Sequence, residues 1–336
     1  MARRHPRANM SIDNPAVAVI IPAFKVTQYI AQALDSCLNQ TFQDFEIIVV
    51  NDGCPDTEAL ERMLQPYQRQ IRYIKQKNAG LAGACNTAIR AARAPLILHL
   101  DPDDWLDPEC LESQVTFMRD HPEMDAVYSN SIFFGDTDWN GTCLMDHYPS
   151  EGEVTFLSVI ESRTCPANPA SIIRREALFR VGLYDEELRS WEDYDMWLRI
   201  LKSGGAMGYN RKPLVHYRRW QGSLTTQALR YGEYALRVLD KARAAGNLTT
   251  EELTALERRR ARMLYDVEIL RGKQALHKKD WAAARAHFAF CLNEAPNNRK
   301  LKVVCLLSTR IPWLLAVALP LREKVQRLIP RSLDAA

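Results

Sequence analysis

Three carboxylates within four residues, Asp101, Asp103 and Asp104, directly follow the apolar run 96–100. An apolar run of this length is typical of a buried strand, and open α/β sheets bind their ligands where such strands end. Carboxylate oxygens suit Mg²⁺ or Mn²⁺, ions that usually hold substrate phosphates as well. The alternative is a turn in which Asp104 caps a helix over 105–118. The spacing alone leaves the metal site and the helix cap equally open.

A second acidic group lies near residue 190. The stretch 191–201 begins Trp191-Glu192-Asp193 and continues with apolar residues at helical spacing, which predicts a helix from Glu192. Acids are common at helix starts because they complement the helix dipole. Trp191 beside them favours a further role, since an apolar neighbour raises the pKa of a carboxylate toward the range useful to a general base.

The charge is unevenly distributed along the chain, although its net value is only +3. Residues 1–226 contain 23 Lys and Arg against 30 Asp and Glu, a net charge of −7, whereas residues 227–336 contain 21 against 11, a net charge of +10. This asymmetry predicts two units with different partners. The basic part fits an anionic membrane surface, or it is only a solvated helix face. No basic motif interleaved with aromatic residues supports nucleic-acid binding.

The eight cysteines show no CxxC pair and no repeated spacing, which favours reduced thiols in a cytoplasm over a disulfide framework or a zinc site. The basic N-terminus lacks the apolar segment of a secretory signal, and no uninterrupted apolar run of about 18 residues predicts a transmembrane helix. We therefore expect a cytoplasmic protein.

Strand-like and helix-like segments alternate through the first hundred residues. Such alternation with short connections predicts a parallel, doubly wound α/β sheet. The predicted strands are 17–21, which Pro22 ends, 45–50, 71–74 and 96–100, and the helices between them are 28–38, 57–67 and 80–92. The connections that follow the strands converge at one edge of such a sheet. They are 22–25, 51–56, 78–86 and 101–104.

Six short blocks occur in order along this part of the chain. They are Ile21-Pro22-Ala23-Phe24, Asn51-Asp52-Gly53-Cys54-Pro55-Asp56, the NxGxxxARN-like 78–86, the DxDD-like 101–104, Gly182-Leu183-Tyr184-Asp185-Glu186, and Glu192-Asp193-Tyr194-Asp195. Their order and spacing resemble those of the family-2 glycosyltransferases, whose nucleotide-sugar-binding fold is usually called GT-A. The resemblance implies a GT-A domain over 16–226, preceded by a disordered leader over 1–15 and followed by an all-α extension over 227–336.

The resemblance also implies a role for particular residues in transferring a sugar from a nucleotide diphosphate donor, with UDP as the expected nucleotide. Phe24 would lie by the base, Asp52 would hydrogen-bond it, and Asp101 would lie near the ribose. Asp103 would bind the Mn²⁺ or Mg²⁺ ion, which offsets charge on the departing diphosphate. Asp193 would deprotonate the acceptor hydroxyl, which gives inversion at the anomeric carbon. Glu192 is a second expected catalytic residue, and Pro22, Ala23 and Gly80 are expected at the nucleotide. The other candidate site residues are Asp104, Trp191 and Arg218.

Two departures from the family pattern concern the diphosphate. Cys85 stands where an Arg is usual, and Trp220 stands where some relatives have a His that contacts the metal or the diphosphate. His216 lies four residues earlier and shares a face with Trp220 in an extended segment, which makes it a weak candidate metal ligand. A lone His is more often structural. Arg218 or Arg219 is the alternative contact to the diphosphate.

The basic C-terminal part is predicted to be helical. Residues 227–262 read as long helices, with Thr249 as an N-cap. Residues 267–297 resemble one tetratricopeptide-type hairpin, which needs neighbouring helices or a partner to cover its face. The apolar 303–321 and the basic, amphipathic 321–329 fit either a helix on the inner face of a membrane or a helix packed on the catalytic domain.

The resemblance implies an inverting glycosyltransferase of the hexosyl or N-acetylhexosaminyl type, active in surface glycan, lipopolysaccharide or capsule biosynthesis. Its acceptor would be a glycan, a lipid-linked sugar or a protein, with peripheral membrane contact through the tail as one option. The alternative is a catalytically silent, sugar-nucleotide-binding scaffold protein whose helical tail binds partners. Cys85 and Trp220 favour that alternative, whereas intact Asp103 and Asp193 speak against it.

Overall fold

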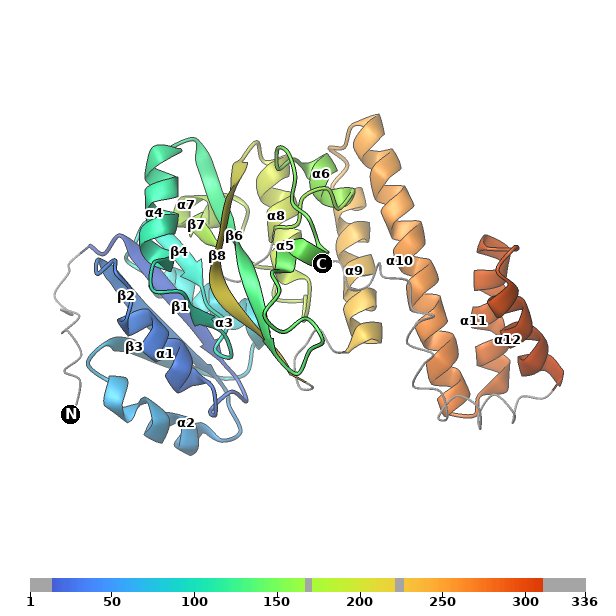
Figure 1. Cartoon of the computed structure of the whole chain (residues 1–336), viewed down its shortest axis with the longest axis horizontal. Helices are drawn as coiled ribbons and strands as arrows, with labels where there is room; N and C mark the ends of the chain where they lie inside the picture. The colour runs from blue at the N-terminus through green and yellow to red at the C-terminus, as the bar shows by residue number, and fades with distance from the viewer. Residues whose placement is uncertain (1–13, 167–170, 221–226, 311–336) are drawn as a thin grey trace. The chain divides into compact units, whose positions relative to one another are not determined.

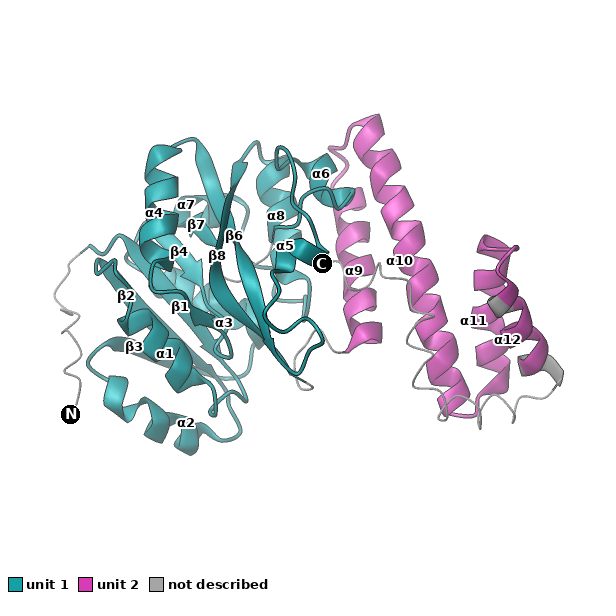
Figure 2. Cartoon of the chain, in the orientation of Figure 1, with its two compact units in different colours: residues 1–223 teal, residues 224–336 magenta. Residues whose placement is uncertain are grey.

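The computed structural model describes residues 14–166, 171–220 and 227–310. The chain divides into two compact units, residues 1–223 and 224–336 (Figure 2). Most of the predicted leader, 1–15, lies outside the described residues. So does the whole of the predicted amphipathic end, 321–329.

Unit 1 is built on one mixed sheet, whose described strands follow the order β3-β2-β1-β4-β7-β6-β8-β5 (Figure 1). The strands are β1 (Val17–Ala23), β2 (Phe45–Asp52), β3 (Ile71–Gln76), β4 (Leu96–His99), β5 (Trp105–Leu106), β6 (Met124–Gly135), β7 (Ile172–Arg174) and β8 (Ala206–Arg219). Strands β3, β2, β1 and β4 are parallel, as the sequence predicts. Strand β7 runs antiparallel to β4 and β6, β6 is parallel to β8, and β5 pairs antiparallel with β8.

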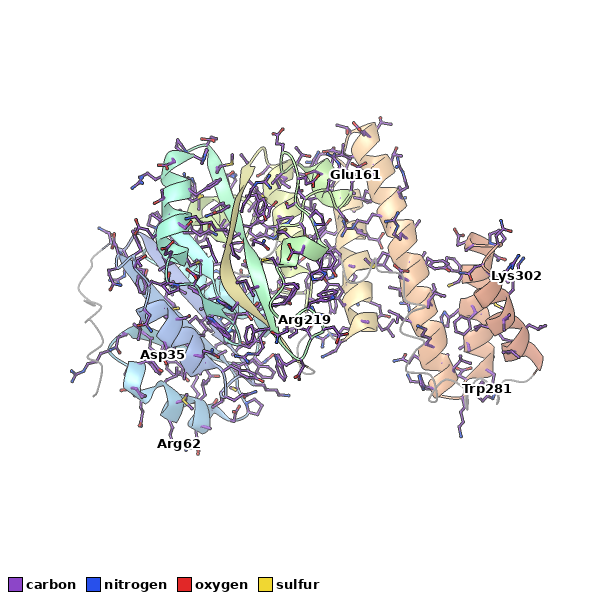
Figure 3. All side chains as sticks on the ribbon, viewed as in Figure 1. Asp35, Arg62, Glu161, Arg219, Trp281 and Lys302 are labelled. Carbon is purple, nitrogen blue, oxygen red and sulfur yellow. The ribbon has the colours of Figure 1, made fainter. Side chains whose placement is uncertain are left out.

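Helices cover both faces of this sheet. Alternate residues of β1, such as Val19 and Ile21, pack in one apolar cluster with α1 (Ile30–Leu38), α2 (Thr57–Leu64) and α4 (Cys110–Asp120). The other face is covered by α3 (Gly80–Ala91), which contacts β1 and β2. The remaining helices of unit 1 are the 3-10 turn η1 (Gln65–Tyr67), α5 (Leu144–His147), α6 (Phe156–Ile160), α7 (Arg175–Arg180) and α8 (Glu192–Lys202). Side chains fill the spaces between the sheet and these helices (Figure 3).

The first strand is longer than the sequence predicts, because β1 continues through Pro22 to Ala23. Strand β4 pairs with β1 only as far as Ile20, and the Ile20 carbonyl accepts from Leu100 N beyond the end of β4. The backbone of Pro22 points to the same side as that of Ile20, where no further strand residue requires its missing N–H. The prediction that Pro22 ends the strand is therefore wrong.

The predicted helix over 105–118 is also wrong. Residues Trp105–Leu106 form β5, and α4 begins only at Cys110. Trp105 pairs with His216 of β8, so a partner far along the chain overrides the local helical pattern. Asp104 consequently precedes a strand, and the interpretation of Asp104 as a helix cap fails.

The described part of unit 2 is helical. Its helices are α9 (Ala228–Ala244), α10 (Thr250–His277), α11 (Trp281–Glu294) and α12 (Arg299–Arg310). Thr249 caps α10 as predicted, because its side chain accepts from Glu252 N and the Glu252 carboxylate accepts from Thr249 N. Helices α10, α11 and α12 share an apolar cluster that includes Leu276 and Phe288. The likeness of this region to a tetratricopeptide hairpin stays a prediction. No described helix is long and apolar enough to cross a membrane.

Candidate active site

The carboxylate of Asp52, at the end of β2, holds the start of α3. Its Oδ1 accepts from Gln76 Nε2 and from Ala79 N, both at 2.8 Å, and its Oδ2 accepts from Gly80 N at 2.8 Å. Asp52 is 2% exposed. Two backbone N–H groups at a helix start favour an anion, so the sequence places a charged acceptor where the helix dipole stabilises it. The Asp52 and Gly80 expected at the nucleotide are thus in direct contact.

The end of β1 lies beside Asp52. Ala23 of β1 is in register with Asn51 of β2, and the loop that follows is tied by a hydrogen bond from Lys25 N to Cys54 Sγ of 3.1 Å. Pro22 and Ala23 are buried, whereas the Phe24 side chain is 40% exposed. Lys25 Nζ lies 5.2 Å from the centroid of the Phe24 ring, and the position of Phe24 by a base stays a prediction.

A buried histidine lies under the acidic end of β4. The Nε2 atom of His99 is 3.3 Å from Asp101 Oδ1 and 3.8 Å from Cys85 Sγ. Burial opposes a charge on His99, but the neighbouring Cys85 and Asp101 outweigh it and hold the pKa of His99 well above its ordinary value. His99 was missed by the sequence reasoning. The raised pKa of His99 favours its cationic form beneath Asp101.

Strand β8 and the residue directly after it fix the two other carboxylates of this group. Arg218 N donates to Asp104 Oδ1 at 2.7 Å, and Trp220 Nε1 donates to Asp103 Oδ2 at 2.7 Å. Burial, together with the charge of Asp101, raises the pKa of Asp103 to about 6. Burial and the charges of Asp103 and Asp101 raise the pKa of Asp104 well above its ordinary value. The group carries more negative charge than its protein partners balance.

The donor set fits a divalent cation. Besides the raised pKa values, Asp104 Oδ2 is buried without a hydrogen-bond partner among the described residues. Within that same part of the chain, no three Cys, His, Asp or Glu side chains converge on one point. The protein would therefore supply one or two carboxylates and leave other positions for phosphate oxygens, as Mg²⁺ sites commonly do. Asp103 is the residue placed for this, since its Oδ1 is not taken by Trp220.

His216 and Arg218 are held by aromatic rings. The His216 ring stacks on Trp105 with centroids 4.7 Å apart, and burial lowers its pKa. The Arg218 guanidinium lies 4.4 Å from the ring centroids of both Tyr29 and Phe134, and Arg218 Nε donates to Asp103 O at 2.8 Å. These contacts give both residues structural partners, and their contacts to a metal and to the diphosphate stay predictions. It is Trp220 that touches the Asp103 carboxylate.

The second acidic group opens α8 as predicted. Trp191 precedes the helix in a left-handed conformation, with φ +64°, which is unusual for a residue with a side chain and occurs mainly at functional or tightly constrained positions. Glu192 is 6% exposed, and Asp193 is partly exposed with its Oδ1 accepting from Tyr194 N at 2.7 Å. Residues Met196, Trp197 and Ile200 are fully buried, which confirms the predicted apolar side of the helix.

The two acidic groups belong to one electrostatic cluster. Burial raises the pKa of Glu192 to about 8, and the charge of Asp193 adds to the increase. Burial also raises the pKa of Asp193 to about 6, with a further increase from Asp101 and a decrease from the charge of His99. Asp193 is therefore the carboxylate that is ionised and partly accessible near neutral pH. Burial and the charge of Asp193 favour the protonated form of Glu192.

Arg189 also belongs to this region and lies in none of the six sequence blocks. Its guanidinium contacts Gly80 at the start of α3. The sequence carried a partial signal, because Gly80, Gly83 and Asn86 recur every third residue and mark a helix face that another segment can approach closely. No pattern identified that segment.

Known proteins match this chain over its N-terminal part. Residues 18–182 match the family model for glycosyl transferase family 2. An uncharacterised glycosyltransferase of Rickettsia felis is 28% identical over 199 residues, which are 57% of this chain and 32% of the relative. One of Methanocaldococcus jannaschii is 29% identical over 215 residues, 62% of this chain and 72% of the relative. The chondroitin synthase of Escherichia coli is 28% identical over 196 residues, 56% of this chain and 27% of that protein. The match thus spans about a third or less of the first and third of these relatives.

Solved structures share the fold. The crystal structure of TarS residues 1–349 from S. aureus in complex with UDP-GlcNAc superimposes with a TM-score of 0.57 and 18% identity, covering 95% of this chain and 83% of that one. The mannosyltransferase PcManGT from Pyrobaculum calidifontis in complex with GDP-Man and Mn²⁺ gives a TM-score of 0.61 and 19% identity, covering 96% and 86%. The predicted fold class, an α/β GT-A sheet with a helical C-terminal part, is confirmed. Residues 18–182, just under half of the chain, are thus similar to glycosyltransferase family 2.

Proposed function

We propose that unit 1 transfers a sugar from a nucleotide diphosphate donor to an acceptor hydroxyl, with inversion at the anomeric carbon. The observation that carries this proposal is the pairing of two acidic groups in one cluster. Asp103, after a central strand, has raised pKa and a free oxygen for a cation, and Asp193, at the start of α8, is the ionised and partly accessible carboxylate. Asp103 suits the departing diphosphate, and Asp193 suits the attacking hydroxyl of the acceptor.

On the leaving side, Asp103 would hold Mn²⁺ or Mg²⁺, and the ion supplies neutralisation of the charge that develops on the diphosphate. Trp220 Nε1 fixes the orientation of this carboxylate by its bond to Oδ2. Asp52 and Gly80 bind the base end of the donor, and the exposed ring of Phe24 stacks on it. The PcManGT complex with GDP-Man and Mn²⁺ and the TarS complex with UDP-GlcNAc support a donor of this class.

On the attacking side, Asp193 takes the proton of the incoming hydroxyl. Its pKa of about 6 leaves it ionised at neutral pH yet more basic than an ordinary carboxylate, which suits a general base. His99 limits that increase by its positive charge. A single base and no neighbouring nucleophile in the six blocks favour direct displacement, and hence inversion.

A catalytically silent scaffold is the second candidate, and one observation favours it. Trp220 Nε1 occupies an oxygen of the carboxylate that a metal would need. Turnover separates the two candidates, since a scaffold would bind nucleotide sugars and release no nucleotide.

The acceptor is proposed to be a glycan, a lipid-linked sugar or a protein. A basic helical unit suits an acceptor that is anionic or presented at a membrane surface. In the described part of unit 2, α12 exposes Val303 and Leu306 together with Lys302 (Figure 3 labels Lys302), which supports a peripheral membrane contact. Relatives named as a chondroitin synthase and as a minor teichoic acid biosynthesis protein support a role in the biosynthesis of surface polysaccharides.

The proposed activity is tested by nucleotide release. Purified protein is incubated with Mn²⁺ and a panel of UDP- and GDP-sugars, with simple glycosides as surrogate acceptors, and free nucleoside diphosphate is measured. We expect the wild type to release nucleoside diphosphate from at least one donor and Asp193→Asn to release none. NMR of the product should show an anomeric configuration opposite to that of the donor. Binding of a donor without release by the wild type would contradict the proposal and support the scaffold.

A further inference from the structure

The turn 101–104, which carries Asp103, is held at two points by one residue of β8. Arg218 N donates to Asp104 Oδ1 at 2.7 Å, and Arg218 Nε donates to Asp103 O at 2.8 Å. The first bond fixes a side chain of the turn, and the second fixes its backbone. Because the backbone rotates only about φ and ψ, a fixed carbonyl at Asp103 limits how far its carboxylate can turn.

The guanidinium of Arg218 is itself held by three side chains. It lies 4.4 Å from the ring centroids of both Tyr29 and Phe134, and its Nη2 donates to Gln32 Oε1 at 2.7 Å. Tyr29 directly precedes α1, Gln32 lies in α1 and Phe134 lies in β6. Aromatic faces fix the plane of a guanidinium, so it loses little further freedom when it forms hydrogen bonds. Arg218 thus connects α1, β6 and β8 to the turn.

Tyr29 also supports the other residue that holds Asp103. Trp220 Nε1 donates to Asp103 Oδ2 at 2.7 Å, and the rings of Tyr29 and Trp220 meet edge-on with centroids 5.6 Å apart. Among the described residues, no hydrogen bond joins Tyr29 to an aspartate of the turn. An effect of the Tyr29 ring on Asp103 would therefore pass through Arg218 and Trp220.

We propose that Arg218 is a positioning residue, which holds the turn 101–104 in the geometry that binds the metal ion before the donor arrives. The inference rests on the proposed function, in which Asp103 binds Mn²⁺ or Mg²⁺. Such ions demand a defined coordination geometry, and a ligand that is already oriented avoids the cost of ordering the turn on binding. Arg218 acts through the turn, and Tyr29 acts through Arg218 and Trp220.

The test separates a residue that orients the metal ligand from one that touches the diphosphate. Binding of UDP and GDP is measured by calorimetry in Mn²⁺ and by ligand-observed NMR in EDTA. The variants are Arg218→Ala, Arg218→Lys, Tyr29→Leu and Tyr29→Phe. Thermal unfolding shows which of them are folded, and the two Tyr29 variants carry the comparison if an Arg218 variant does not fold.

The matched control is Arg211→Ala. Arg211 lies earlier in β8, about 20 Å along the strand from Arg218. Its guanidinium also lies near a tyrosine ring, 5.5 Å from the Tyr209 centroid. The control therefore removes an arginine of the same strand with a similar aromatic contact, away from the turn.

We expect Arg218→Ala to weaken nucleotide binding in Mn²⁺ about 10- to 100-fold, as for lost hydrogen bonds from a charged donor. Binding in EDTA should change less than about threefold, because the turn acts only through the metal. Arg218→Lys should behave like Arg218→Ala, since an ammonium keeps the charge but lacks the fork that reaches Asp103 O and Gln32 together.

The Tyr29 pair tests the support behind Arg218. Tyr29→Leu should weaken binding in Mn²⁺ about 3- to 10-fold, the range of one cation–π contact. Tyr29→Phe keeps the ring and should match the wild type, as should Arg211→Ala. A loss in Tyr29→Phe as large as that in Tyr29→Leu would contradict the role assigned to the ring.

Other outcomes overturn the inference in distinguishable ways. Equal weakening in Mn²⁺ and in EDTA, with affinity retained in Arg218→Lys, would assign the guanidinium to the diphosphate. Unchanged binding in folded Arg218→Ala would leave Arg218 a packing role only. A wild type that binds equally well in Mn²⁺ and in EDTA would reject the proposed metal role of Asp103, and the inference with it.

Discussion

The two acidic groups of the site are positioned by different parts of unit 1. Asp103 and Asp104 follow a central strand. Trp220 Nε1, directly after β8, fixes Asp103, and Arg218 N of β8 fixes Asp104. Asp193 instead opens α8, and the segment before that helix is docked along α3. The first group is thus set by the sheet and the second by contacts between a segment and a helix. The difference implies that the two groups respond differently to substitutions.

The largest effect is expected at the second group. Asp193→Asn removes the proposed base and keeps its size, so turnover should fall by about 10²- to 10⁴-fold. Nucleotide binding should stay within about threefold of the wild type, because the first group is intact. Initial rates of nucleotide release, with calorimetry as the binding control, measure this. A parallel loss of binding would show that the two groups are not separable.

The next largest effect is expected from a substitution that releases the segment 183–189 from α3. Asn86→Ala leaves the buried N–H and C=O of Tyr184 without their partner and releases Glu186. We expect a loss of about 1–3 kcal/mol in the free energy of unfolding, together with a reduced turnover number, because Asp193 follows the segment. Urea denaturation and kinetics measure both. Lost stability with unchanged turnover per folded molecule would mean that α8 is positioned without the segment.

A smaller effect is expected from the tryptophan that holds the first group. The hydrogen bond from Trp220 Nε1 to Asp103 Oδ2 lowers the pKa of Asp103. Trp220→Phe removes this bond, and the pKa of Asp103 should therefore rise further above about 6. Metal-dependent nucleotide binding requires the ionised carboxylate and should weaken about 10-fold at pH 6 and little at pH 8. Trp281→Phe at the start of α11 is the control. Tighter binding at both pH values would show instead that the indole competes with the metal.

The smallest effect concerns the cation beneath the cluster. The charge of His99 lowers the pKa of Asp193, so His99→Gln should raise that pKa above about 6. A general base must be ionised, and the acid limb of the pH–rate profile should therefore move to higher pH while the rate at pH 8 changes little. His121→Gln, a substitution of a half-exposed residue after α4, is the control. A shift of the acid limb to lower pH would contradict the inference that the charge of His99 lowers the pKa of Asp193.

The comparison also explains what the sequence could predict. The alternation of strands and helices predicts which loops lie at the same edge of the sheet. Asp52, Asp101 and Asp103 were predicted as site residues on that basis. The sequence did not predict elements whose structure depends on pairing with residues far along the chain. Trp105 pairs with β8, so the helix predicted there does not form, and Pro22 stays in β1 because β4 ends early. The Arg189 contact depends on where a segment docks after the fold has formed, and no local pattern carries that information.

The most direct test of the account is calorimetric titration of UDP and GDP into the wild type and Asp103→Ala, with and without Mn²⁺. The account predicts binding that depends on Mn²⁺ in the wild type and is lost or at least 10-fold weaker in the variant, since one or two carboxylates and the phosphates share the ion. Binding that is independent of metal, or equal in the two proteins, would contradict the assignment of Asp103 to a metal ion that holds the diphosphate.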